Sequence, residues 1–276
     1  MSTRLPQSDL AIVSGSGLAV VPTGAEVVDE IGYRDLGWPA SGAAGHLNRV
    51  LTARWAPPEG GPSRRGRHAA TGAAEVRLLL ACGRAHLYEG WSAAELARPV
   101  DDLAEAGVRW LLLTNAVGAL DPGLAPGAAV VVTEVVDLQG EPRVRPPVAE
   151  VAGAAVAERL VRALAPALPT SRGRYVAVPG PHYETPAEAA WLHGFGEVVG
   201  MSAAAEVRAA KRHDLSVTVL SLVANTAGAP LDHGDVLAAT GRLEVRLARG
   251  LARLVTAVVA RTAQSVARDE HEGSPA

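Results

Sequence analysis

Short apolar runs alternate with stretches of helical periodicity along the whole chain. An apolar run bounded by glycine or polar turns is typical of a buried strand. Such runs occur at 10–13, 76–81, 108–114, 128–136, 175–178, 198–199 and 215–224. Apolar residues at a period of 3.6 predict helices at 93–106, 148–168, 203–212 and 236–263, with a further helix beginning at Thr185-Pro186.

This alternation predicts an α/β fold in which helices cover both faces of a sheet. Neither an internal repeat nor a linker between two apolar regions divides the chain, so we expect one domain over residues 8–263. The Pro-, Gly- and Arg-rich residues 57–74 predict an exposed loop, and residues 264–276 a frayed tail.

Composition and charge exclude several functional classes. The 26 basic and 29 acidic residues almost cancel, which argues against a nucleic-acid-binding or polybasic membrane protein. A single cysteine, Cys82, excludes an intramolecular disulfide and a Cys-rich zinc site. The polar first ten residues lack the apolar stretch of a signal peptide, and no apolar run is long enough to span a membrane. We therefore expect a soluble, cytoplasmic protein.

Polar or glycine-rich segments follow six of the predicted strands. Ligands of open α/β sheets bind beyond the carboxyl ends of the strands, so these segments are candidates for a common site. They are residues 14–17, 83–90, 114–118, 179–185, 200–202 and 224–226. The first is a Ser/Gly turn without the lysine of a P-loop or the spacing of a dinucleotide motif, which disfavours a nucleoside triphosphate or NAD site.

Four of these side chains suit ligand binding, although each also has an ordinary structural explanation. Arg84 and His86 lie two residues apart on an extended chain and suit a tetrahedral oxyanion, but alone they are as easily a surface charge and a packing residue. Glu184 follows a stiff Pro-Gly-Pro segment, where a carboxylate also suits a helix N-terminus. Asn225 offers an amide and a carbonyl, or stabilises a turn.

Taken together and in this order, the motifs resemble purine nucleoside phosphorylases of the trimeric, 6-oxopurine-specific class. The resemblance covers roughly residues 10–262. Its most specific parts are Gly-Arg-Ala-His-Leu-Tyr-Glu-Gly at 83–90 and Gly-Pro-His-Tyr-Glu-Thr-Pro-Ala-Glu at 180–188, where the related methylthioadenosine phosphorylases differ. The resemblance implies a central mixed sheet flanked by helices.

The resemblance also implies roles for individual residues. Those implied for the phosphate site are Ser16, Arg84, His86, the backbone of Ala116, and Ser202. Those implied for the sugar are Tyr88, Met201 and His233, and for the base Tyr183, Glu184 and Asn225. His46 resembles a residue of the loop that gates the site, and the catalytic roles fall on Asn225, His86 and Glu184.

The reaction implied is the reversible phosphorolysis of inosine- and guanosine-type nucleosides to a purine base and ribose 1-phosphate. Inorganic phosphate is then a co-substrate, no metal or cofactor takes part, and the assembly is a homotrimer. An amide at Asn225 that strengthens its contact to N7 as the purine gathers negative charge would lower the barrier. Because a carboxylate at 225 would suit adenine better, we expect inosine and guanosine to be preferred to adenosine.

The chain also departs from the family pattern. The segment Gln139–Glu150 is short and lacks the phenylalanine that usually reaches a neighbouring subunit's site, Val117 replaces a small residue, and Thr226 replaces a common lysine. Two alternatives therefore stay open: a phosphorylase for a 5′-modified or adenine nucleoside, and a non-catalytic nucleoside-binding paralogue. The presence of Arg84, His86, Ser202, Glu184 and Asn225 argues against the second, because a non-catalytic binder has little need for a phosphate site.

Overall fold

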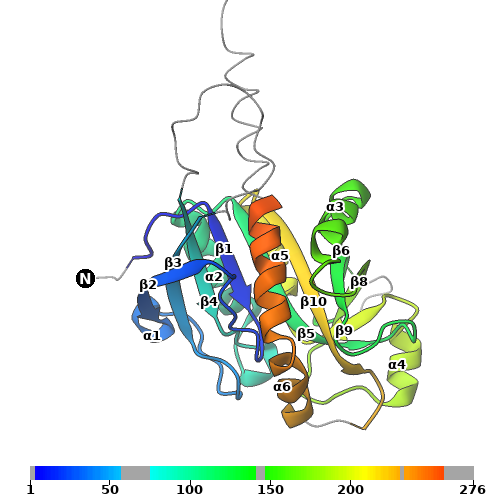
Figure 1. Ribbon diagram of the computed structural model, residues 1–276. Helices are drawn as coiled ribbons and strands as arrows, with labels where there is room; N and C mark the ends of the chain where they lie inside the picture. Colours follow the sequence, from blue (N-terminus) through cyan, green and yellow to red (C-terminus); the bar gives the residue numbers. More distant parts are fainter. Residues whose placement is uncertain (1–3, 57–74, 141–146, 231–232, 258–276) are drawn as a thin grey trace, which may run out of the picture.

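The computed structural model describes residues 4–56, 75–140, 147–230 and 233–257 (Figure 1). The predicted loop at 57–74 and the predicted tail at 264–276 lie outside these residues, as do the last six residues of the predicted helix 236–263. Within the described residues, no helix is both long and apolar enough to cross a membrane.

The core of the structure is one mixed sheet of ten strands. The strands are β1 Leu10–Ser14, β2 Ala25–Gly32, β3 Arg49–Trp55, β4 Val76–Cys82, β5 Trp110–Ala119, β6 Ala129–Asp137, β7 Val148–Glu150, β8 Thr170–Ala177, β9 Val198–Gly200 and β10 Ser216–Thr226. Their order is β10-β6-β8-β9-β5-β1-β4-β3-β2, with β7 paired to β6. Because β5 also pairs with β10, the strands β5, β9, β8, β6 and β10 close into a ring.

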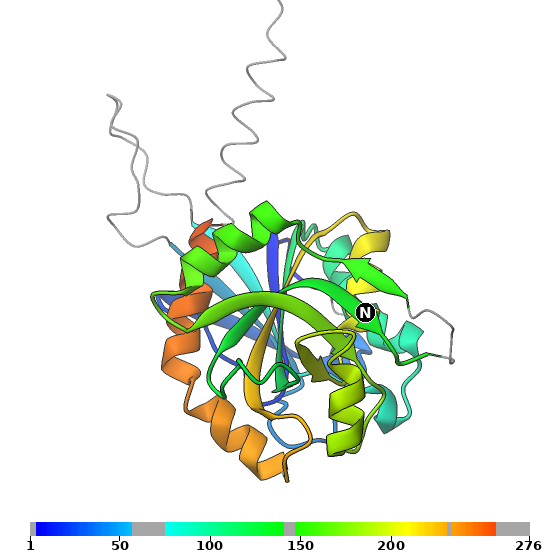
Figure 2. The same ribbon diagram turned by 90° about the vertical axis from the view of Figure 1, so that its right-hand side faces the viewer.

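Helices cover the sheet on both faces, as the alternating pattern predicts. They are α1 Tyr33–Leu36, α2 Ala93–Glu105, α3 Ala154–Leu164, α4 Pro186–Leu192, α5 Ala204–Arg212, α6 His233–Gly241 and a helix over 244–257. Buried residues of α2 and α5 pack on one face, and those of α3 and the helix 244–257 on the other. Figure 2 shows α3 (green) and the helix 244–257 (orange to red) together on one side of the strands. The predicted α/β class with a mixed central sheet is confirmed.

Two helix starts follow the capping signals in the sequence. Ser92 precedes α2 and accepts a hydrogen bond from the Glu95 amide, while the Glu95 carboxylate reaches back to the Ser92 backbone. Thr185 and Glu188 make the same reciprocal arrangement before α4, with Pro186 at its first position. The second cap sets the direction in which the chain leaves the Glu184 segment.

Other predictions need correction. Residues 148–150 form the strand β7 against β6, so the helix predicted from 148 begins only at Ala154. The predicted final helix is divided at residues 242–243 into α6 and the helix 244–257, next to Gly241, a poor helix former. The strands β2 and β3 were not predicted; most of β2 is exposed, and it carries three charged side chains rather than a buried apolar run.

The strands β5 and β10 also extend further than predicted. β5 continues past Thr114 through the Asn-Ala-Val-Gly segment to Ala119, and β10 includes Asn225. Their pairing shifts register between Val223 and Asn225, opposite Gly118. The candidate residues at these strand ends are therefore held by a sheet rather than by free turns.

The end of α5 allows a test of local strain. Asp214 has a left-handed backbone, with φ of 53°, directly after the helix. A side chain is disfavoured there, and a carboxylate at a helix C-terminus opposes the helix dipole. We expect Asp214→Gly to raise the free energy of unfolding by about 0.5–1 kcal/mol, measured by urea denaturation. Asp214→Ala, the control, removes the charge but keeps the backbone strain, so its free energy of unfolding should rise less. An Asp214→Gly variant that is less stable than the parent would contradict this account.

Candidate active site

A cleft opens at the carboxyl ends of the central strands, with about 650 Å³ of empty space that includes the open solvent at its mouth. Its walls come from the turn after β1, from β5, from the segments around β9, and from β10 and α6. Most of the predicted site residues line it: Ser16, His86, Tyr88, Ala116, Tyr183, Glu184, Met201, Ser202, Asn225 and His233. Arg84 and His46 are the exceptions.

Arg84 lies behind the wall of the cleft rather than in it. Its side chain is buried, and its Nε donates to Oε1 of Glu206 over 2.5 Å. Nη1 donates to the Thr114 carbonyl, and a Cβ added at Gly15 would lie only 3.2 Å from the same Nη1. Gly15, which does line the cleft, therefore lets the chain pass directly over the guanidinium. The idea that Arg84 is an ordinary surface charge is excluded.

The guanidinium keeps capacity for a ligand. A third donor, Nη2, lies 3.4 Å from the Val13 carbonyl. Arginine has five N–H groups, so these contacts leave one on each terminal nitrogen.

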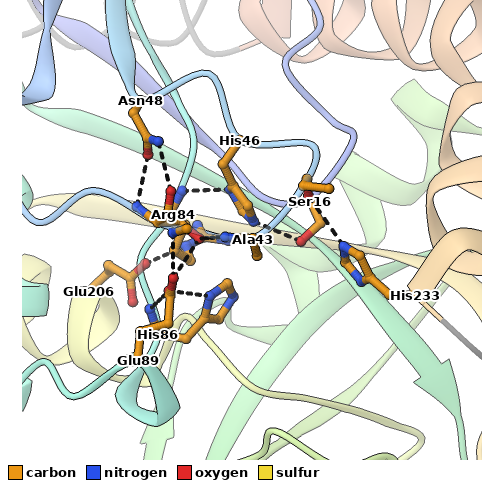
Figure 3. Close-up of polar contacts among 12 residues, drawn as sticks. Ser16, Ala43, His46, Asn48, Arg84, His86, Glu89, Glu206 and His233 are labelled. Atoms are coloured by element: carbon orange, nitrogen blue, oxygen red, sulfur yellow. Dashed lines mark hydrogen bonds and ion pairs between the residues drawn. The ribbon is translucent and has the colours of Figure 1, made fainter.

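His46 connects two of the predicted phosphate residues (Figure 3). Its Nδ1 lies 2.9 Å from the Arg84 backbone N–H, and its Nε2 lies 2.9 Å from Oγ of Ser16. Since the Arg84 amide can only donate, Nδ1 must be unprotonated, and Nε2 carries the hydrogen towards Ser16. Burial, and then the nearby His86 and Arg84, lower the pKa of His46 to about 4. His46 is thus a neutral bridge between Ser16 and Arg84.

Glu89 orients His86. Its Oε2 accepts the His86 amide at 2.8 Å and lies 3.2 Å from Nδ1 of the ring. Its Oε1 accepts the Ser41 hydroxyl and the Gly42 amide. Burial alone would raise the pKa of Glu89, but the hydrogen bonds from His86, Gly42 and Ser41 lower it to about 2. The ionised carboxylate therefore holds Nδ1–H, and the ring stacks on Tyr88 at a centroid distance of 4.8 Å.

Other residues that line the cleft carry groups suited to a sugar and a base. Nε2 of His233 lies 3.2 Å from the Ala44 carbonyl, and its Nδ1 lies 3.5 Å from the Tyr183 hydroxyl. Burial raises the pKa of Glu184, which adjoins Tyr183. Asn225 donates from Nδ2 to the Thr226 carbonyl.

A cation site is not visible in the part of the chain that the structure describes. No group of three or more histidine, cysteine, aspartate or glutamate side chains is placed there to hold a metal ion.

Comparison with known proteins identifies the family. The profile of the phosphorylase superfamily matches residues 40–258. The chain belongs to this superfamily. It is 35% identical over 246 residues to a purine nucleoside phosphorylase of Mycobacterium leprae, covering 86% of this chain and 85% of that protein. It is 28% identical to purine nucleoside phosphorylase 1 of Bacillus subtilis, covering 93% and 94% of the two chains.

Solved structures support the same fold. The Schistosoma mansoni purine nucleoside phosphorylase in complex with inosine has a TM-score of 0.66 and 24% sequence identity, covering 90% of this chain and 89% of that one. A schistosoma purine nucleoside phosphorylase in complex with hypoxanthine has a TM-score of 0.67, with 23% identity and 90% of each chain covered.

Some residues of this phosphorylase-superfamily site were not identified from the sequence. Glu89 stands three residues after His86 within the 83–90 block, a spacing that could have signalled the pair. Glu206 is separated from Arg84 by 122 residues and lies within α5, so no local pattern reveals it. Asn115 and Gly118, which belong to the predicted segment 114–118 but were given no role, also line the cleft.

The state of His46 predicts a pH dependence of stability. Its folded-state pKa of about 4 lies below the unfolded value of 6.5, so the unfolded chain takes up the proton first. The contribution of His46 to stability is complete above pH 6.5 and is lost as the pH falls towards 4.

We expect the wild type to lose about 2 kcal/mol more than His46→Gln between pH 6.5 and 4.5 in urea denaturation. Glutamine keeps one acceptor and one donor but does not titrate. Parallel pH profiles of the two proteins would show that His46 is not held neutral by the fold.

Proposed function

We propose that the chain is a purine nucleoside phosphorylase that converts inosine- and guanosine-type nucleosides and phosphate to the purine base and ribose 1-phosphate. The observation that carries this proposal is the cleft itself. Ser16, His86 and Ser202 line it together with Glu184 and Asn225, and the buried Arg84 lies behind Gly15 in its wall. The first set suits an oxyanion, and the second suits the edge of a purine.

The phosphate end offers donors that are already oriented. His46 directs its Nε2–H at Ser16 Oγ, which leaves the Ser16 hydroxyl hydrogen available for an oxyanion. Glu89 accepts Nδ1–H of His86, so Nε2 of this tautomer is an acceptor that can take the P–O–H hydrogen of HPO₄²⁻. Hydrogen bonds from a guanidinium, hydroxyls and a main-chain amide are favourable for a phosphate dianion. Such fixed donors lose little freedom when the anion binds, because the protein has already ordered them.

The base end offers complementary groups. A carboxylate at Glu184 accepts the N1–H of a 6-oxopurine, and the Asn225 amide donates to N7. When the bond between C1′ and N9 breaks, its electron pair passes to the purine, so the hydrogen bond to N7 strengthens in the transition state.

The proposed step balances without a cofactor. An oxygen of HPO₄²⁻ forms the new bond to C1′, the electron pair of the glycosidic bond goes to the purine, and the proton of the phosphate ends on the base. The products are the neutral purine and the ribose 1-phosphate dianion. Phosphate beneath C1′ also stabilises the positive charge that develops on the sugar, so positioning supplies much of the rate.

The sugar end favours an unmodified 5′-hydroxyl. The Ala44 carbonyl can only accept, so Nε2 of His233 carries a hydrogen towards it, and Nδ1, which faces the Tyr183 hydroxyl over 3.5 Å, is the acceptor nitrogen of that tautomer. A 5′-hydroxyl can donate to this nitrogen, whereas a 5′-thioether cannot. The homotrimer and the cytoplasmic location expected from the sequence stay predictions.

The experiment that tests the function is product analysis of a nucleoside panel with and without phosphate. We expect hypoxanthine and guanine to be released from inosine and guanosine only when phosphate is present, with adenosine and 5′-methylthioadenosine much slower. A non-catalytic paralogue would bind inosine without releasing base, and a hydrolase would release it without phosphate. Faster cleavage of adenosine or methylthioadenosine would contradict the proposed substrate.

Asn225 provides a test of how the base is distinguished. Because a carboxylate accepts a hydrogen bond from the amino group of adenine, we expect Asn225→Asp to lower kcat/KM for inosine by about 100-fold and to reduce its preference over adenosine. Thr226→Ser changes the neighbouring side chain without altering charge and is the control. An Asn225→Asp variant with unchanged kcat for inosine would remove the assigned contact to N7.

A further inference from the structure

The Ser202 backbone is held by a side chain that does not line the cleft. Tyr175, on β8, is fully buried, and its hydroxyl lies 2.8 Å from the Ser202 carbonyl and 3.0 Å from the Ser202 amide. A phenol has one hydrogen to donate and lone pairs to accept. It therefore donates to the carbonyl and accepts from the amide, so that one side chain satisfies both polar groups of one residue.

The chain around Ser202 needs such support. Ser202 lies between β9 and α5, in neither the sheet nor the helix. Ala203, which follows it, is a buried non-glycine residue with φ of 67°, a conformation that disfavours a side chain. Among the described residues, the backbone partner of the Ser202 carbonyl is the Ala204 amide, at 2.9 Å. A strained turn of this kind persists only where its surroundings fix it.

The packing around the phenol agrees with this role. A Cβ at Gly200 would lie 3.0 Å from the Tyr175 hydroxyl oxygen and 3.1 Å from Cε2, so the glycine leaves the space that the ring occupies. Burial raises the pKa of Tyr175 to about 12, which keeps the hydroxyl protonated and able to donate. The buried, protonated hydroxyl therefore stabilises the turn through its two hydrogen bonds to the Ser202 backbone.

We propose that Tyr175 is a positioning residue for phosphate: by holding both backbone groups of Ser202, it directs the Ser202 hydroxyl at the anion. This inference rests on the proposed function, because it assumes that phosphate binds beside Ser202. It assigns no contact between Tyr175 and either substrate. Its consequence is selective, since loss of the phenolic hydroxyl should weaken the use of phosphate and leave the binding of the nucleoside intact.

Tyr175→Phe in the full chain tests this selectivity. We expect KM for phosphate to rise about tenfold, because a small displacement of a contact group has a large effect, while Kd for inosine without phosphate changes less than twofold. Ser8→Ala is the matched control, because it removes a buried hydroxyl bonded to the Arg77 carbonyl near the start of β1, away from the cleft. A Tyr175→Phe variant that changes neither constant, or weakens phosphate and inosine equally, overturns the inference.

A double-mutant cycle separates positioning from general destabilisation. If Tyr175 acts through the Ser202 hydroxyl, Tyr175→Phe should change KM for phosphate by less than about twofold in a Ser202→Ala background. A full tenfold effect in that background overturns the inference. Should Tyr175→Phe not fold, Gly200→Ala takes its place in the same cycle, because its Cβ presses on the phenolic oxygen. We expect Gly200→Ala to raise KM for phosphate in the wild-type background and to change it by less than about twofold in the Ser202→Ala background.

The outcomes also separate this inference from the proposed function. If the wild type releases no base with phosphate, the proposed function fails, and calorimetry with inorganic phosphate still tests the role of Tyr175. Weaker phosphate binding by Tyr175→Phe than by the wild type then supports the inference, and equal or undetectable binding by both overturns it. If the wild type is active and the cycle is additive, the function stands and the inference fails.

Discussion

The Arg84 guanidinium is only 5% exposed and would be an uncompensated buried charge without Glu206, whose Oε1 lies 2.5 Å from its Nε. A buried ion pair of this kind gains little net stability, but removing one partner is costly because the other charge stays buried. The pair joins segments far apart in the sequence. Glu206 comes from α5, and the other guanidinium contacts are carbonyls of Val13 on β1 and Thr114 on β5. This part of the cleft wall can be built only where these elements meet.

The backbone of the same segment continues the network. The Arg84 amide fixes the tautomer of His46, and His46 in turn directs its hydrogen at Ser16. The carbonyl of the preceding residue, Gly83, accepts the hydroxyl of the buried Tyr33. Side chain and main chain of Arg84 are therefore both constrained, so groups that face the cleft are ordered before a ligand arrives. Preorganised donors of this kind are a main source of electrostatic stabilisation in enzymes.

The residues that face the cleft were largely predictable, whereas those that hold them were not. Ser16, His86, Ser202 and Asn225 all follow or end apolar strands, and the carboxyl ends of neighbouring strands meet at one edge of a sheet. Glu206 leaves no local pattern, because its partner is distant in the sequence and its position fits an ordinary charged helix residue. The same limit applies to the exposed strand β2. It has no buried apolar run that a sequence pattern could reveal, and it is stabilised by its antiparallel pairing with β3.

The charge distribution of the cleft favours phosphate over water as the proposed nucleophile. The positive charge of Arg84 is already balanced by Glu206, and Glu89 is ionised beside His86. A phosphate dianion therefore gains mainly from oriented hydrogen-bond donors rather than from an unpaired cation. A water molecule has two hydrogens and two lone pairs and cannot occupy so many donors at once, whereas the several oxygens of phosphate can. Phosphate therefore binds more favourably than water because it can accept more of these hydrogen bonds in the right directions. The buried ion pair between Arg84 and Glu206 keeps the donors in those directions.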